Sequence, residues 1–84
     1  MCNGKFIAMA KELIADYYRD TLNINVSPDK IGVVWISKVL QNNKGIFACF
    51  GTDDQFMFEV TRNGDKCETY IDVYDKKENI CIPI

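Results

Sequence analysis

Two glutamates lie on either side of the strongest turn signal in the chain. Asn63-Gly64 is the preferred pair at the centre of a two-residue β-hairpin, because both positions need a positive φ. With Arg62 paired to Asp65 across that turn, Glu59 lies directly opposite Glu68. Facing carboxylates repel, which raises the pKa of one, and such a pair can do acid–base or metal chemistry. The alternative is an exposed pair screened by neighbouring basic side chains, so no catalytic residue and no metal ligand is assigned.

The same strand face gathers aromatic, acidic and methionine side chains. Exposed aromatic rings on a sheet can stack on single-stranded bases or anchor a protein interface. The carboxylates on this face disfavour phosphate, so a protein partner is the preferred interpretation, and ordinary cross-strand packing is the alternative. The predicted interaction surface comprises Met57, Glu59, Glu68, Tyr70, Asp72 and Tyr74.

Composition narrows the classes of function. The chain of 84 residues contains no histidine, which excludes a Ser-His-Asp triad, a Cys-His pair and imidazole metal ligands. With 10 Lys and Arg against 12 Asp and Glu, the net charge is −2, so strong electrostatic binding of duplex nucleic acid is not expected. A domain this small buries only about 60–65% of its unfolded surface, which leaves little room for a deep pocket. These features predict a protein that is not an enzyme and uses no cofactor.

The N-terminal segment and the cysteines indicate the compartment. No apolar run approaches the roughly 20 residues that span a bilayer. Lys11, Glu12 and Asp16 interrupt the apolar stretch that a signal peptide needs, so a cytoplasmic protein without membrane contact is predicted. Reduced cysteines are then expected, and the absence of a C-x-x-C pair gives no support for structural zinc. Buried positions are expected for Cys49, Cys67 and Cys81, with Cys2 as a near-terminal thiol.

The spacing of apolar residues predicts one N-terminal amphipathic helix over residues 4–22. The helix is expected to end near Leu22-Asn23, because asparagine can take the left-handed conformation there. From Ile31 onward the chain is rich in β-branched and aromatic residues, which are typical of strands. Strands are predicted at 31–41, 46–51, 55–62 and 66–74, and residues 80–83 can add a short edge strand.

Short loops between sequential strands imply an antiparallel meander. Residues 1–84 are therefore predicted to form a single α+β domain, with the helix packed on a four- or five-stranded antiparallel sheet. The strand face that carries Phe56, Phe58 and Val60 is expected to pack on the helix. The strand at 31–41 is apolar on both faces, which predicts a central position with Trp35 in the core and an interface as the second interpretation.

Two stretches resemble a family of small uncharacterised proteins of bacteriophages and prophages. One runs from Val33 to Lys44 and includes Leu-Gln-Asn-Asn-Lys, which is followed by Gly45 where the family pattern has alanine. The other runs from Glu59 to Asn79 and includes Asn-Gly-Asp-Lys. The opening helix is similar too, so the resemblance covers nearly the whole chain. It implies a phage or prophage origin and the cytoplasm of an infected bacterial cell, and it transfers no activity and no catalytic residue.

These observations predict a small non-enzymatic phage or prophage protein that acts by protein–protein interaction. The expected partner is a host or phage protein, or a second copy of the chain in a homodimer. The alternative is an accessory protein that binds single-stranded nucleic acid, which needs a basic stripe beside the aromatics that the charge pattern does not favour. A third hypothesis is a minor enzyme that uses the Glu59/Glu68 pair.

Overall fold

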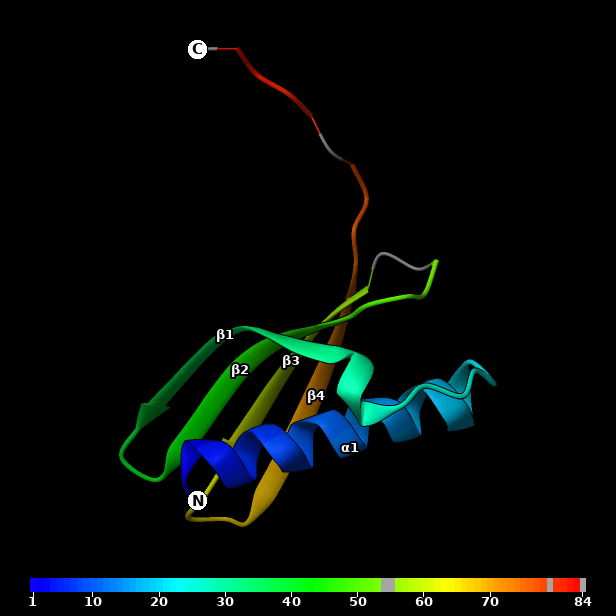
Figure 1. Ribbon diagram of the computed structural model, residues 1–84. Helices are drawn as coiled ribbons and strands as arrows, with labels where there is room; N and C mark the ends of the chain where they lie inside the picture. Colours follow the sequence, from blue (N-terminus) through cyan, green and yellow to red (C-terminus); the bar gives the residue numbers. More distant parts are fainter. Residues whose placement is uncertain (54–55, 79, 84) are drawn as a thin grey trace.

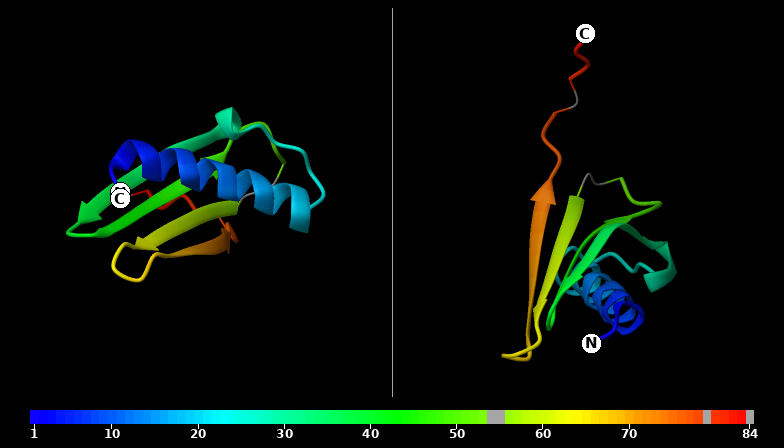
Figure 2. Two further views of the ribbon diagram at one scale, coloured as in Figure 1. Left: turned by 90° about the horizontal axis from the view of Figure 1, so that it is seen from below. Right: turned by 90° about the vertical axis from the view of Figure 1, so that its left-hand side faces the viewer.

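The computed structural model describes residues 1–53, 56–78 and 80–83. A single helix lies across one face of an antiparallel sheet whose strands follow one another in chain order (Figure 1; Figure 2). This arrangement confirms the predicted α+β class, with four strands in the sheet. The elements are α1 (Asn3–Thr21), the 3₁₀ helix η1 (Pro28–Lys30), β1 (Ile31–Val39), β2 (Asn42–Cys49), β3 (Phe56–Asn63) and β4 (Glu68–Asp75).

Helix α1 buries every fourth residue, because side chains at that spacing share one face of an α-helix. At its C-terminal end Asn23 takes a φ of 56°, as predicted, and the Ile24 N–H donates to the Tyr18 carbonyl at 3.0 Å. The helix stripe meets the alternate residues of the strands in one core. The buried residues are Phe6, Ala10, Ile14, Tyr18, Ile31, Phe47, Phe58 and Val60.

The first hairpin is shorter than predicted, because Leu40 and Gln41 alone connect Val39 to its partner Asn42. Leu40 supplies the positive φ of 56° that the turn needs. The expected turn at residues 42–45 is instead the start of β2. Asn43 is fully buried there, and its side-chain amide donates to Asn3 Oδ1 at 3.3 Å, so its polar group binds the start of the helix rather than closing a turn.

The second hairpin has a longer connection than the predicted Asn63-Gly64 turn, since Asn63 pairs with Glu68. The Asn63 side-chain oxygen accepts a hydrogen bond from the Lys66 N–H at 3.3 Å, and the residue with positive φ is Cys67. Gly64 is required for a different reason. A Cβ atom at Gly64 would overlap the carbonyl of Gln41, to which the Gly64 N–H donates at 3.1 Å. The two turns therefore pack directly against each other.

The new turn shifts the register of β3 and β4 by four residues, so that Glu59 faces Asp72 rather than Glu68. Because side chains alternate with a period of two, an even shift leaves every residue on its predicted face. Phe58 and Val60 accordingly reach the core as expected. The predicted first residue of this strand, Gln55, lies outside the described residues.

The position of β1 was predicted wrongly, because it is an edge strand and not a central one. One edge of β1 is paired with β2. A register irregularity between Val33 and Trp35 leaves Val34 without a partner in β2. Trp35 is 49% exposed and does not belong to the core. The physical reason is topological: in a meander whose strands follow chain order, the first strand has a neighbour on one side only.

The predicted edge strand at 80–83 is also absent from the described chain. After β4 the chain continues away from the sheet and from α1 (Figure 1). Ile80 and Ile82 are 68% and 70% exposed, so the apolar side chains that suggested a strand find no cover on their own sheet.

Candidate interaction surface

The sheet has one face without a helix, and this open face is the candidate site. The right-hand view of Figure 2 shows α1 on one side of the strands only. Strand alternation and register place every second side chain on the uncovered side. The open face comprises Trp35, Ser37, Val39, Asn42, Lys44, Ile46, Met57, Glu59, Thr61, Asn63, Glu68, Tyr70, Asp72 and Tyr74.

All six residues of the predicted interaction surface lie on the open face. Met57 and Glu59 belong to β3, and the other four belong to β4. Tyr70 and Tyr74 are 54% and 55% exposed, and Met57 is 39% exposed. The register shift changes which of these residues are opposite each other, but it does not separate the group.

The predicted pairing of Glu59 with Glu68 is wrong, because the two carboxylates occupy different rows of the sheet. Glu59 lies across from Asp72, and its Oε1 is 3.5 Å from Lys44 Nζ on β2. Glu68 lies across from Asn63 and accepts a hydrogen bond from the Tyr70 hydroxyl. Each glutamate therefore has a separate partner.

The hydrogen bond between Tyr70 and Glu68 also raises the pKa of the Tyr70 phenol. Loss of the hydroxyl proton would remove the hydrogen bond and place a phenolate beside a carboxylate, and both effects raise the pKa of Tyr70. Tyr70 therefore presents a neutral, anchored ring on the open face.

A hollow of about 460 Å³ lies in the open face near the two turns. Trp35 and Val39 line it from β1, and Tyr70 lines it from β4. Lys44 and Thr61 lie between them on the two central strands. The hollow is thus a shallow, largely apolar depression between two aromatic side chains, with Lys44 as the charged residue of its lining.

The predicted interaction surface does not include the β1 side of this hollow, because the core is the first interpretation of Trp35 and an interface is the second. Val39 is 64% exposed and belongs to the same apolar margin. The signal that could have found both residues was the meander itself, because an antiparallel sheet of sequential strands always leaves its first strand at an edge. The apolar pattern on both sides of this strand fits burial and an interface equally well, and the structure shows exposure at Trp35.

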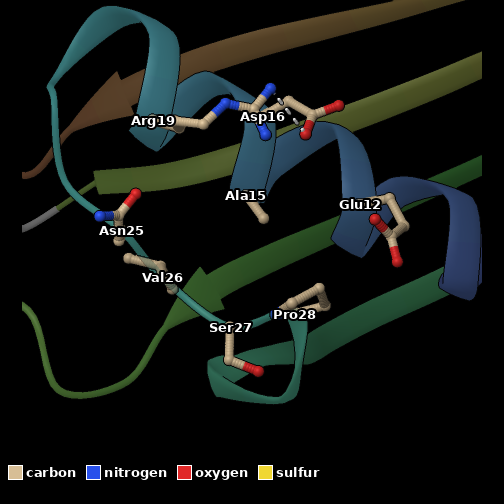
Figure 3. Close-up of a pocket in the computed structure, with 8 residues that line it drawn as sticks. All are labelled: Glu12, Ala15, Asp16, Arg19, Asn25, Val26, Ser27 and Pro28. Carbon is tan, nitrogen blue, oxygen red and sulfur yellow. Dashed lines mark ion pairs between the residues drawn. The ribbon is translucent and has the colours of Figure 1, made fainter.

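A second hollow of about 330 Å³ lies between α1 and the segment that follows it (Figure 3). The carboxylates of Glu12 and Asp16 line it, but Arg19 already uses its guanidinium on its own helix, 3.2 Å from Asp16 and 2.9 Å from Asp20. These contacts raise the pKa of Arg19 and lower the pKa of Asp20. Because Arg19 and Asp16 already form an ion pair on α1, this hollow is a weaker candidate for a binding site than the open face.

The cysteines do not follow their predicted burial. Cys67 and Cys81 are exposed, and Cys49 is half-buried. Cys2 is the residue before the first turn of α1, and the nearby Lys5 backbone N–H lowers the pKa of its thiol. Within the described ranges, no cluster of three or more cysteine or acidic side chains could hold a metal ion.

Comparison with known proteins gives a family without an activity. Among the described residues, no helix is long and apolar enough to cross a membrane. Neither curated proteins nor solved structures gave a match to the chain. One family model matches residues 7–84, which includes the sheet, the open face and the segment beyond β4. The chain belongs to the family of unknown function DUF6275.

Proposed function

We propose that this protein is a non-enzymatic binding module that holds another protein against the open face of its sheet. The observation that carries the proposal is the hollow between Trp35 and Tyr70, on a face that no element of the described chain covers. Tyrosine, tryptophan and methionine are enriched in the centres of protein interfaces. All three residue types are present and exposed on this face.

The charges of the open face indicate what the partner presents. Glu59, Glu68 and Asp72 are accompanied by a single basic side chain, Lys44. A complementary surface therefore carries lysine or arginine around at least one apolar side chain that enters the hollow. The same carboxylates would repel the phosphates of a nucleic acid, which favours a protein ligand.

The bonding of the carboxylates favours binding over catalysis. Glu59 is paired with Lys44, and Glu68 accepts from Tyr70, so neither is placed as a free base beside the hollow. A general base needs a reacting group within hydrogen-bond reach and a proton that it can take. The hollow instead offers ring faces, a threonine hydroxyl and an ammonium group, which are contacts that hold a ligand.

Single-stranded nucleic acid is the second candidate, because Trp35, Tyr70 and Tyr74 offer ring faces on an antiparallel sheet. Base stacking on such rings is worth about 1–3 kcal/mol per base. This candidate predicts binding that weakens steeply as salt rises, since phosphate contacts release counterions.

Affinity capture with matched variants tests the proposal. The full chain is used as bait in a bacterial lysate, the setting that the phage or prophage resemblance implies, with and without nuclease. Trp35→Ala/Tyr70→Ala removes both walls of the hollow. Ile24→Ala is the control, because Ile24 is a similarly exposed apolar side chain outside the open face.

The proposal predicts a protein that is retained by the wild type and by Ile24→Ala, survives nuclease and is lost with Trp35→Ala/Tyr70→Ala. Retention by the double variant would contradict the assignment of the open face. Loss of every retained protein on nuclease treatment would move the conclusion to nucleic acid.

A further inference from the structure

We propose that the ligand of the open face is the 76–83 segment of a second copy of this chain. This inference rests on the proposed function, because it names the partner that the open face binds. In the resulting dimer each copy supplies its own segment to the hollow of the other, which is the reciprocal contact that twofold symmetry produces.

The segment has the chemistry that the open face requires. It begins with Lys76, Lys77 and Glu78, which together carry a net charge of +1, and continues to two isoleucines, Ile80 and Ile82. In an extended chain, residues two apart point to the same side, so both isoleucines can face one surface. Both are more than two-thirds exposed in the single chain, which leaves their apolar area available for burial. The segment thus combines the basic and apolar groups that complement the open face.

The hollow has room for such side chains. Its volume of about 460 Å³ lies within the range of about 300–1,000 Å³ that is typical of ligand-binding clefts. Trp35 and Val39 form an apolar wall for isoleucine. The carboxylates of Glu68 and Asp72 lie on the adjoining β4 side of the face, where a lysine of the segment can reach them.

The geometry favours a second copy over the segment's own sheet. The hollow lies beside Tyr70, near the turns, whereas β4 ends at Asp75 beside Phe56, at the other end of the strand. Tyr70 lies five positions before Asp75, roughly 16 Å at about 3.3 Å per residue, so the segment would have to turn back along β4 to reach the hollow of its own chain. Beyond Asp75 the chain continues away from the sheet (Figure 1; right-hand view of Figure 2). The family match covers residues 7–84 and therefore includes this segment.

Sedimentation equilibrium of the full chain over a wide range of concentration tests the inference. Ile80→Asp/Ile82→Asp removes the apolar side chains at exposed positions outside the core, so folding is preserved. Lys5→Asp is the matched control, because it changes the net charge by the same amount, −2, at an exposed site on α1. The emission of Trp35, the single tryptophan of the chain, reports cover of the hollow in the same samples.

The inference predicts a wild-type dimer, an equally stable Lys5→Asp dimer, and at least about a 30-fold weaker dimer for Ile80→Asp/Ile82→Asp, the size of one interface hot spot. Trp35 emission should shift to longer wavelength as each dimer dissociates. Trp35→Ala/Tyr70→Ala should weaken association to a similar degree.

Three results would overturn the inference. A wild-type chain that stays monomeric at every concentration excludes the second copy, without affecting the capture of another protein by the open face. A monomer whose Trp35 emission changes in Ile80→Asp/Ile82→Asp assigns the hollow to the chain's own segment. A dimer that resists the isoleucine substitutions but is lost with Trp35→Ala/Tyr70→Ala assigns the open face to another surface of the second copy, and supports the proposed function alone.

Discussion

The two faces of the sheet are built from the same strands and are used in opposite ways. Neighbouring residues of β3 show the contrast, since Phe58 is fully buried under α1 and Met57 is 39% exposed on the open face. Phe58 packs its ring against Tyr17 and Tyr18, with centroid distances of 5.7 and 5.5 Å. The comparison teaches that aromatic content alone does not distinguish a core from a binding surface. The distinction comes from which side the single helix covers.

If this contrast holds, equal truncations on the two faces should have unequal effects on folding. Phe58→Ala should lower the free energy of unfolding by about 3–5 kcal/mol, because it leaves a cavity among packed rings. Met57→Ala on the adjacent residue should lower it by less than about 1 kcal/mol, since that side chain is partly solvated. Urea denaturation of both variants measures the difference. Similar losses for both would mean that the open face is also a structural core.

Two glycines extend this contrast, because Gly45 lies beneath a buried phenylalanine ring and Gly32 lies beneath an exposed one. A Cβ at Gly45 would lie 2.9 Å from the buried Phe47 ring and 3.2 Å from the Trp35 carbonyl. A Cβ at Gly32 would overlap only the ring of Phe50, which is 64% exposed and free to turn aside. Gly45→Ala should therefore cost about 1–3 kcal/mol, as other overpacked cores do. Gly32→Ala should leave the urea midpoint nearly unchanged. A loss of stability equal to that of Gly45→Ala would show that the Phe50 ring is held in place.

The helix and the covered face follow closely from the sequence, because their residues obey one simple spacing. Phe6, Ala10, Ile14 and Tyr18 recur every four positions and all are buried. The strand residues alternate, and the period of two assigned each predicted site residue to the correct face even though the β3–β4 register was displaced. An even error in the predicted register therefore changes which residues pair across the strands, but it leaves each residue on the predicted face of the sheet.

The turns and the edge could not be predicted from local patterns, because contacts between distant residues determine them. A Cβ atom at Gly64 would overlap the turn at Gln41, and the side-chain amide of Asn43 donates to Asn3, 40 residues earlier in the chain. The local preference of Asn-Gly for tight turns predicts neither of these long-range contacts. The exposure of Trp35 likewise depends on strand order and not on the residues around it.

The Lys44–Glu59 ion pair of the open face should contribute much less to the free energy of unfolding than any core residue. A double-mutant cycle with Lys44→Ala and Glu59→Ala should give a coupling of about 0.2–1 kcal/mol, because both side chains are in contact with solvent. The coupling should fall as salt is added. A larger, salt-independent coupling would indicate that this pair supports the fold and not the charge pattern of the surface.

The smallest effect concerns pH and separates Tyr70 from the structural tyrosines. Its pKa is raised in the folded chain by the hydrogen bond to Glu68. A raised folded-state pKa contributes stability that is present below the unfolded value, about 10, and is lost as pH rises through the folded value. Glu68→Gln should lower the pKa of Tyr70, which absorbance titration of the phenolate measures against Tyr70→Phe. An unchanged titration would show that the hydrogen bond does not persist in solution.

The claim that the open face is the binding surface is tested most directly by oxidative footprinting. The full chain is exposed to hydroxyl radicals, once as the free chain and once in complex with its partner, which is the captured protein or a second copy of the chain. The oxidised side chains are then mapped by mass spectrometry. The account predicts that Trp35, Tyr70 and Tyr74 become protected in the complex, whereas Met1 and Ile24, which are exposed elsewhere, keep their oxidation rates. Protection of Met1 and Ile24 with unchanged Trp35 and Tyr70 would contradict it and place the partner on another surface.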